Sequence, residues 1–282
     1  MPILIDHSSR IICFGMATER GRFQIQQALA YGTQVVALVE PRPKETHVFS
    51  LPIFASARQA VRLTNGTVAL IMSEPQKATD AIMEADEAGI QLIVCLTKEI
   101  PAHDMVEALR IMKQRGKSRL IGPGSCGIIN PEQARCGLMP GFLWTKGPVG
   151  MVSSSDTLAY VAAGALSSSG KGQSTFVGIG EALATSVVDV LELFEQDPYT
   201  EMTLLLGLPT GQEMGVCEWL RAQKRKPLAV LLAGHTPLSY FKERGVEAKE
   251  AGEPLKKAGA TLVSKLTDLP RVCQEILQRN VL

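Results

Sequence analysis

A short loop bounded by Gly15 and Gly21 follows the first apolar run of the chain, and its composition suits anion binding. Between the glycines lie four candidate binding residues, Ala17, Thr18, Glu19 and Arg20. A glycine-bounded loop that leads into a helix presents backbone N–H groups to a phosphate, and an arginine beside it binds phosphate oxygens. The alternative is that the glycines only allow the backbone to turn. The loop is not G-x-G-x-x-G, which disfavours NAD and FAD.

A second basic loop follows the next apolar run and contains Arg42 and Lys44. Strand ends that are adjacent in a parallel sheet bring their loops together, so these two cations, with Arg20 and Arg22, are candidates to collect a phosphorylated ligand. The alternative is that they are exposed, solvated loop residues.

Residues for metal or nucleophilic chemistry are scattered. The six cysteines and four histidines form no C-x-x-C pair and no zinc-type spacing, which predicts buried free thiols, a reducing compartment and no bound metal. We expect no flavin either. His235 stands at the end of a predicted strand, where functional residues gather in α/β folds.

The elements that must position these residues alternate between strand and helix in the first half of the chain. Gly32, Gly89 and Gly116 each follow a helical segment, where a glycine favours the end of the helix. The predicted strands are Arg10–Phe14, Gln34–Val39, Val68–Met72 and Gln91–Leu96, and the predicted helices are Gly21–Tyr31, Gln76–Ala88 and Ala102–Arg115.

The alternation resumes after a Pro- and Gly-rich stretch. The later strands are expected near Val149–Val152, Ser174–Ile179, Met202–Leu206, Leu228–Ala233 and Thr261–Val263, and the later helices near Thr157–Leu166, Thr185–Glu195, Glu213–Lys224, Pro254–Ala258 and Leu269–Gln278. Repeated βαβ units predict an α/β protein with two consecutive doubly wound domains. We place the first at residues 1–125, a connection at 126–147 and the second at 148–282.

The overall composition limits the function classes. Twenty-nine basic against 28 acidic residues give a net charge of +1, which argues against nucleic acid or a charged membrane surface as a partner. No apolar run approaches the roughly 20 residues that span a bilayer. The first residues lack the basic and long apolar regions of a signal peptide, which predicts a cytoplasmic protein or one whose targeting peptide has already been removed. We expect a cytoplasmic protein that binds a small molecule or another protein.

Eight segments, in order and over nearly the whole chain, resemble the α subunit of succinyl-CoA synthetase (succinate–CoA ligase). They are Ile3–Asp6, Arg10–Cys13, Ala28–Thr33, Leu51–Phe54, Asp86–Ile90, Ile100–Pro101, Ile121–Pro123 and Gly172–Gly180. The resemblance implies a Rossmann-like domain that binds coenzyme A, followed by a flavodoxin-like ligase domain. In that family the second domain carries a histidine that transfers phosphate between the nucleotide site of a β subunit and the acyl acceptor.

Carried over residue by residue, the resemblance adds binding positions in two turns of the first domain. The family's V-P-A and I-T-E-G turns fall on Ser73–Pro75 and Leu96–Glu99, and the family's lysine in the second loop falls on Pro43, between two cations. The positions implied for coenzyme A are Gly15, Ala17, Thr18, Glu19, Arg20, Gly21, Arg42, Lys44, Ser73, Pro75, Leu96, Thr97 and Lys98.

The second domain departs from the family pattern. The S-R-S-G-T-L-x-Y helix start becomes Ser153–Tyr160, which keeps Tyr160 as a candidate catalytic residue but replaces an arginine and a glycine with Ser154 and Asp156. The family's glutamate falls on Leu208, and its G-H-A-G-A motif is missing. His235 is the candidate substitute for the phosphorylated histidine.

We therefore expect an α-subunit-like protein that binds coenzyme A or a related phosphorylated ligand without the phosphohistidine step. Two alternatives stay open: transfer of an acyl or carbamoyl group from a preformed acyl phosphate, and an active ligase with His235 as phosphocarrier. The expected partner is a β-like ATP-grasp subunit or a second copy of the chain. Leu191 and Phe194 are either an apolar surface for that partner or the buried stripe of a helix.

Overall fold

The computed structural model of the protein describes residues 3–209, 211–222, 225–232 and 248–279. Contacts along the chain divide it into two compact units. The first unit consists of Leu4–Gly141 with Gly178–Thr185, and the second of Met1–Ile3, Phe142–Val177 and Ser186–Leu282.

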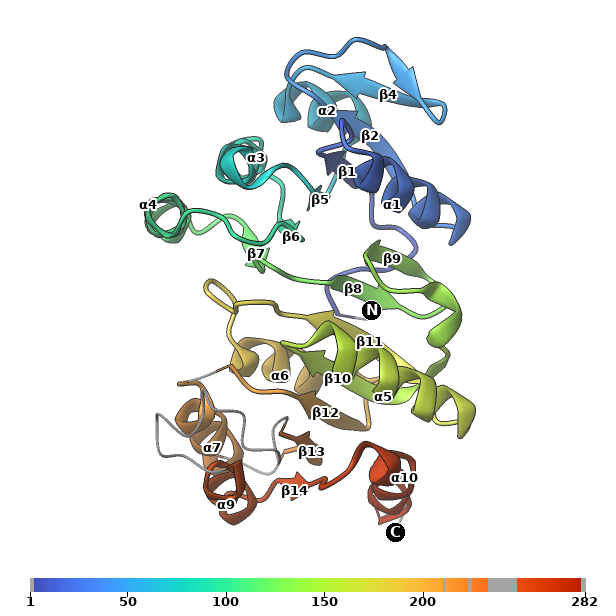
Figure 1. Ribbon diagram of the computed structural model, residues 1–282, viewed down its shortest axis with the longest axis vertical. Helices are drawn as coiled ribbons and strands as arrows, with labels where there is room; N and C mark the ends of the chain where they lie inside the picture. Colours follow the sequence, from blue (N-terminus) through green and yellow to red (C-terminus); the bar gives the residue numbers. More distant parts are fainter. Residues whose placement is uncertain (1–2, 210, 223–224, 233–247, 280–282) are drawn as a thin grey trace. The chain divides into compact units, whose positions relative to one another are not determined.

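A seven-stranded sheet with the order β3-β4-β2-β1-β5-β6-β7 forms the centre of the first unit (Figure 1). Its strands are β1 (Ile11–Phe14), β2 (Val35–Val39), β3 (His47–Val48), β4 (Leu51–Phe54), β5 (Val68–Ile71), β6 (Leu92–Cys95) and β7 (Arg119–Ile121). Neighbouring strands are parallel except for the antiparallel hairpin β3–β4. The chain passes from β1 to β2 on one side and later to β5 on the other, so the strand order reverses at β1.

The helices of this unit cover its sheet and explain why the strands are apolar throughout. They are α1 (Glu19–Ala30), α2 (Ala57–Thr64), α3 (Pro75–Glu87) and α4 (Ala102–Arg115). Residues of α2, α3 and α4 share one buried cluster with β1, β2, β5 and β6. Strands β1, β5 and β6 are buried along their whole length, as the continuous apolar runs of a covered parallel sheet require.

The second seven-stranded sheet has the order β14-β13-β12-β10-β11-β8-β9. Its strands are β8 (Gly127–Asn130), β9 (Ala134–Gly137), β10 (Lys146–Ser153), β11 (Gln173–Gly178), β12 (Met202–Leu206), β13 (Leu228–Leu231) and β14 (Thr261–Leu262). Strands β10, β12, β13 and β14 run parallel to one another, whereas β8 and β9 form an antiparallel hairpin.

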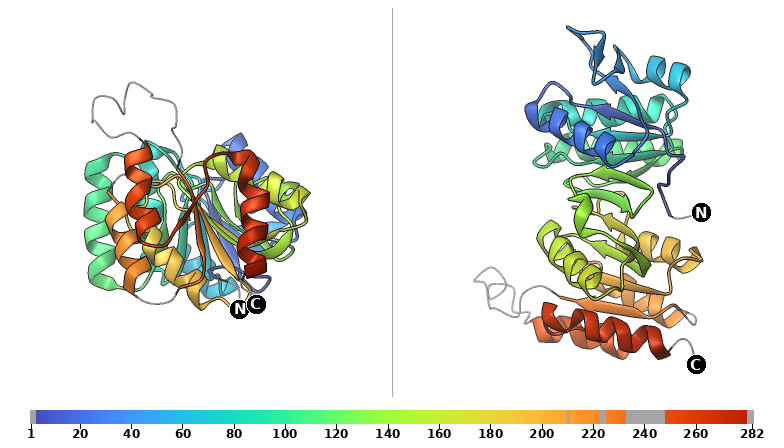
Figure 2. Two further views of the ribbon diagram at one scale, coloured as in Figure 1. Left: turned by 90° about the horizontal axis from the view of Figure 1, so that it is seen from below. Right: turned by 90° about the vertical axis from the view of Figure 1, so that its right-hand side faces the viewer.

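Helices lie on both faces of the parallel part of this sheet. They are α5 (Asp156–Ser168), α6 (Val187–Gln196), α7 (Glu213–Ala222), α9 (Ala248–Lys257) and α10 (Leu269–Arg279), with short 3-10 turns at Gly141–Leu143 and Leu266–Asp268. Helix α5 packs beside α10, and α7 packs beside α6 and α9 (Figure 2). Together the two units confirm the predicted fold class of two doubly wound α/β domains.

Several elements were not predicted from the sequence, among them the short strands β3, β4 and β7. The polar segment Ala57–Thr64 forms helix α2. The Pro- and Gly-rich stretch 126–147, expected as a connection, contains the hairpin β8–β9. A side chain at Gly127 would overlap the backbone of Cys136, so this glycine lets the two strands of the hairpin approach each other.

The expectation that Leu191 and Phe194 form an apolar surface is wrong, and the buried-stripe alternative is confirmed. Both side chains lie on α6 and are at most 1% exposed. The Phe194 ring occupies the space above Gly150 in β10, where an added Cβ would lie 2.6 Å from a ring carbon. Helix α6 therefore uses these residues to pack on its own sheet.

All six cysteines are free and buried, as the sequence predicts. Among the residues that the structure describes, no helix has both the length and the apolar character needed to cross a membrane. The same residues contain no cluster of three or more His, Cys, Asp or Glu side chains arranged to hold a metal ion.

Candidate functional site

The loops that follow β1, β2, β5 and β6 lie together at the carboxyl ends of these parallel strands, on either side of the point where the strand order reverses. Such switch points are the usual ligand sites of doubly wound sheets. Two adjoining pockets open there, both lined by Thr18 and Ser73. We name them the cationic pocket, which contains Arg20, Lys98 and Glu99, and the acidic pocket, which contains Glu40, Glu74, Lys77, Asp80 and Glu84.

The first loop is held by backbone packing around its two glycines. Gly15 has a φ of +86°, and a side chain there would overlap the Met72 backbone. A side chain at Gly21 would overlap the Gly15 carbonyl oxygen. Both glycines are therefore required by the fold, whether or not a phosphate approaches the loop.

Thr18 caps helix α1 at this site. Its hydroxyl accepts a hydrogen bond from the Gly21 amide (3.0 Å) and lies 3.3 Å from the Gly15 carbonyl oxygen. The amino end of α1 thus faces the region shared by the two pockets. The remaining unpaired amides and the helix dipole at such an end attract an anion.

The cationic pocket has a volume of about 420 Å³, within the usual range for small-molecule sites. Eight of the predicted binding residues line it: Thr18, Arg20, Gly21, Ser73, Pro75, Leu96, Thr97 and Lys98. The Thr97 hydroxyl donates to the Ser73 carbonyl oxygen (2.7 Å) and ties the loop after β6 to the loop after β5. The rest of the lining of this pocket includes apolar residues, namely Met72, Pro75, Leu96 and Leu138.

Gln24 is a lining residue of the cationic pocket that the sequence did not reveal. It lies one turn after Gly21 on α1 and is only 9% exposed. The buried Arg135 on β9 donates to the Gln24 side-chain oxygen at 2.7 Å. Because Arg135 already donates to the oxygen, the amide nitrogen of Gln24, a hydrogen-bond donor, is the group that we assign to a ligand.

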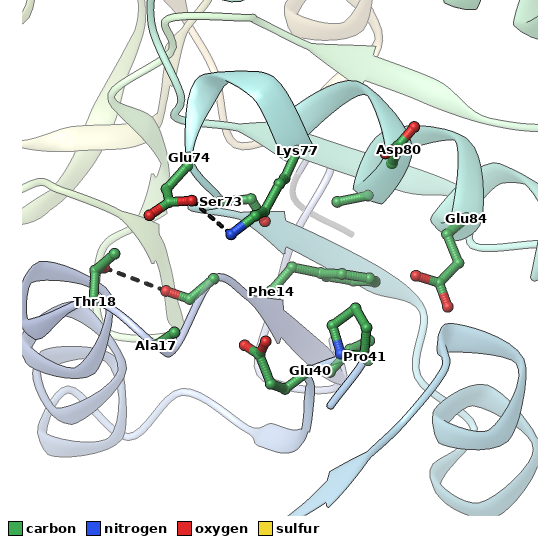
Figure 3. Close-up of a pocket in the computed structure, with 13 residues that line it drawn as sticks. Phe14, Ala17, Thr18, Glu40, Pro41, Ser73, Glu74, Lys77, Asp80 and Glu84 are labelled. Carbon is green, nitrogen blue, oxygen red and sulfur yellow. Dashed lines mark hydrogen bonds and ion pairs between the residues drawn. The ribbon is translucent and has the colours of Figure 1, made fainter. Parts of the chain in front are cut away.

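The acidic pocket has a volume of about 160 Å³ and lies between β2 and α3 (Figure 3). Of the predicted residues, Gly15, Ala17, Thr18 and Ser73 line it. Lys77 and Glu74 form an ion pair of 2.6 Å at one side of the pocket, and Glu40 stands at the end of β2. The hydrogen bond to Glu74, with the negative charges of Glu74 and Glu40, raises the pKa of Lys77.

The structure separates the other predicted residues from these pockets. Glu19 is exposed in the first turn of α1, and Arg42 and Lys44 are exposed on the loop between β2 and β3; none of the three lines either pocket. Arg22 instead forms an ion pair with Glu45 at 3.0 Å. The sequence alone gave no means to separate these cations from Arg20 and Lys98.

The two catalytic candidates belong to the second unit. Tyr160 is half-buried on α5, more than one turn from the helix start. His235 lies outside the described residues.

The hydroxyl groups at the serine-rich start of α5 hydrogen-bond to backbone atoms of this segment and of the end of β12. The Ser153 hydroxyl donates to the Leu206 carbonyl oxygen (2.8 Å) and accepts from the Ser155 amide (2.9 Å). The Ser154 hydroxyl donates to the Gly207 carbonyl oxygen (3.2 Å), and the Ser155 hydroxyl caps the helix by accepting from the Leu158 amide (3.4 Å). All three hydroxyls therefore serve capping or strand-end contacts.

Family models match both halves of the chain. A model described as a CoA binding domain matches residues 6–99, and one described as a succinyl-CoA ligase like flavodoxin domain matches residues 146–275. The first match covers the loops after β1, β2 and β5 and reaches the loop after β6.

Several known proteins are similar over nearly the whole chain. The succinate–CoA ligase [ADP-forming] subunit alpha of Aquifex aeolicus is 36% identical over 291 residues, which cover 99% of this chain and 95% of the relative. The malate–CoA ligase subunit alpha of Methylorubrum extorquens is 38% identical, with 99% of both chains covered.

A solved ATP citrate lyase from Methanosaeta concilii has the same fold. Its TM-score is 0.84 at 19% identity, and the match covers 99% of this chain but 52% of the lyase chain, so this protein corresponds to about half of that one. The full-length relatives and the two domain models together place the chain in the family of succinate–CoA ligase α subunits.

Proposed function

We propose that the protein is an α-type ligase subunit that binds coenzyme A, or a closely related phosphorylated ligand, and that it does not form a phosphohistidine. The observation that carries the first part is the meeting of Arg20, Lys98 and the amino end of α1 at the cationic pocket. The family supports the same ligand, because the model matched by residues 6–99 is a CoA binding domain.

The diphosphate of the ligand belongs at the amino end of α1. There it meets the positive end of the helix dipole and the guanidinium of Arg20, and hydrogen bonds to a charged partner are among the stronger ones. Lys98, exposed on the loop after β6, adds a second positive charge to the same pocket.

The pantetheine arm of the ligand belongs along the rest of the cationic pocket. Met72, Pro75 and Leu138 provide apolar contacts for its methylene groups. Its two amides contain carbonyl oxygens that need donors, and the Gln24 amide nitrogen is suitably held by Arg135 to provide one.

Calorimetric titration with coenzyme A tests this binding. We expect saturable binding that weakens as salt rises, and about a tenfold loss of affinity in Arg20→Gln because a charge-assisted contact is removed. Lys113→Gln is the matched control: Lys113 is an exposed cation in the last turn of α4 and lines neither pocket. Absence of binding at millimolar coenzyme A, or equal losses in both variants, would contradict the proposal.

Two described positions support the absence of a phosphohistidine. The glutamate that accompanies the histidine in the family is replaced by Leu208, which cannot orient an imidazole. Ser154, in place of the arginine, donates its hydroxyl to the Gly207 carbonyl oxygen and offers no positive charge to a phosphate. Loss of one such electrostatic contact commonly costs about 3 kcal/mol in the transition state.

Phosphorylation assays test this second part. The protein is incubated with succinyl-CoA and radiolabelled phosphate, and with radiolabelled ATP in the presence of any co-purified partner, while an active succinate–CoA ligase is assayed in parallel. We expect acid-labile, base-stable label in the active ligase only. Label that appears in this protein and vanishes in His235→Ala would overturn the proposal and assign His235 as the phosphocarrier.

We further propose that the protein works with an ATP-grasp β-like subunit. The relatives are named as alpha subunits of ligases, which supports a heteromeric assembly. Co-expression with a β-like chain, followed by light scattering, should give a complex heavier than the 30.4 kDa monomer. A multiple of that mass in the absence of any other chain would identify a homo-oligomer instead.

A further inference from the structure

The charges of the acidic pocket are unsuited to a phosphate. Four carboxylates and one ammonium line it, and that ammonium, Lys77, is already paired with Glu74 at 2.6 Å. Glu84 has a structural role, because its carboxylate accepts a hydrogen bond from the Ala57 amide (2.8 Å) at the start of α2. A pocket of this charge repels an anionic group and favours neutral hydrogen-bond donors.

Glu40 is the carboxylate best placed to meet a ligand. It follows β2 directly, next to the loop after β1 that leads into α1, and it is half-buried. Within the described part of the chain, its carboxylate makes no hydrogen bond and no ion pair. In doubly wound sheets with the G-x-G-x-x-G dinucleotide fingerprint, an acidic residue about 20 residues further along accepts a hydrogen bond from a ribose hydroxyl. This chain lacks that fingerprint, but Glu40 places a carboxylate acceptor at the end of β2, beside the same loop.

The two pockets are close enough to bind one ligand. Thr18 and Ser73 line both of them, so a diphosphate at the amino end of α1 lies between a nucleoside in the acidic pocket and an arm in the cationic pocket. Phe14, Val39 and Pro41 add apolar surface for the base.

We infer that the acidic pocket takes a ribose whose 2′ and 3′ hydroxyl groups are both free, so that the ligand class of this site is a 5′-diphosphate ester of adenosine with no phosphate on the 2′ or 3′ oxygen. This inference rests on the proposed function. It specifies that dephospho-coenzyme A binds more tightly than coenzyme A, because the 3′-phosphate of coenzyme A adds negative charge beside Glu40.

The competing arrangement uses the exposed loop cations. Arg42 and Lys44 lie between β2 and β3, near Glu40 in sequence but outside both pockets. If the ribose faced this loop, the same two cations would bind the 3′-phosphate, and coenzyme A would be the preferred ligand.

Calorimetric titrations of dephospho-coenzyme A and coenzyme A separate these arrangements. We expect the wild-type protein to bind dephospho-coenzyme A about tenfold more tightly. Glu40→Gln, which keeps the size of the side chain and removes its charge, should shrink this ratio severalfold by improving coenzyme A binding. Glu19→Gln removes an equal charge from an exposed position outside the pockets and should leave the ratio unchanged.

Two results overturn the inference alone. Equal affinities for the two ligands show that the ribose does not face the acidic pocket. Tighter binding of coenzyme A, lost in the double variant Arg42→Gln with Lys44→Gln, assigns the 3′-phosphate to the loop cations. In both cases the proposed function stands, whereas failure of both ligands to bind overturns the proposed function itself.

Discussion

Gly15 and Gly32 have nearly the same backbone conformation, with φ of +86° and +88°, but different surroundings. A side chain at Gly15 would overlap the Met72 backbone, while nothing lies within 4 Å of the corresponding position at Gly32. The pair therefore separates the cost of a left-handed conformation from the cost of crowding. The crowding arises only at Gly15, which belongs to the binding loop.

We predict that Gly15→Ala destabilises the protein much more than Gly32→Ala. The left-handed conformation costs either alanine about 1–2 kcal/mol, and crowding against backbone adds about 1–3 kcal/mol at Gly15 alone. Urea unfolding of both variants measures the difference. Equal losses would mean that the loop after β1 moves away from β5 at little cost.

The buried thiols make a second prediction at the residue scale. Burial raises the pKa of Cys95 and of Cys136 to about 12, against about 9 for an exposed thiol. Above pH 9 the unfolded chain loses these protons while the folded chain keeps them. The free energy of unfolding should therefore fall as pH rises from 9 toward 12, by about 1.4 kcal/mol per pH unit for each such thiol.

Cys95→Ala tests this dependence. The variant lacks one of the raised thiols, so its free energy of unfolding should fall with pH less steeply than that of the wild type, by the contribution of one thiol. Lysine and tyrosine titrations are common to both proteins and cancel in the comparison. Parallel pH profiles between pH 9 and 10.5 would show that Cys95 ionises equally in the folded and unfolded chains.

At the scale of single elements, the start of a helix can both stabilise the fold through its cap and bind an anion, and substitutions can separate these two roles. Thr18 caps α1 at the pocket, and Ser186 caps α6 in the second unit through a reciprocal pair of bonds with Asp189. Thr18→Val and Ser186→Ala should each lower the free energy of unfolding by about 1 kcal/mol. Only Thr18→Val should also weaken coenzyme A binding, by about threefold to tenfold, because only that helix faces the ligand.

Unfolding and calorimetric titration of the two cap variants check this expectation. Equal stability with unequal affinity supports a direct role of the α1 start in binding. A loss of affinity in Ser186→Ala as large as in Thr18→Val would show that affinity merely follows stability.

At the scale of the whole molecule, both pockets belong entirely to the first unit. We predict that coenzyme A slows backbone hydrogen exchange in the loops at residues 15–21, 72–77 and 96–99. Residues 153–160, where the serine hydroxyls already hydrogen-bond to backbone atoms of α5 and of the end of β12, should exchange at an unchanged rate. Hydrogen exchange is measured by mass spectrometry with and without coenzyme A. Protection that appears only in the second unit would contradict the prediction.

The sequence alone was enough to predict the alternation of strands and helices and therefore the fold class. Hydrophobic period is a local property, and the buried strands of a covered parallel sheet stand out as continuous apolar runs. Gly116 was predicted to follow a helix for an equally local reason, and it caps α4 in the left-handed conformation. The resemblance to the ligase family likewise depended only on residues read in order.

What only the tertiary structure decided is which side chains share a surface. Arg20 and Lys98 line the cationic pocket while the equally basic Arg42 and Lys44 do not, because lining depends on where separate strands end. The contact between Gln24 and Arg135 could not be predicted from the sequence, because the two residues are 111 positions apart and meet only in the folded chain. Leu191 and Phe194 were ambiguous because an apolar stripe has the same sequence whether a sheet or a partner covers it, and only the packing of α6 on β10 resolved it.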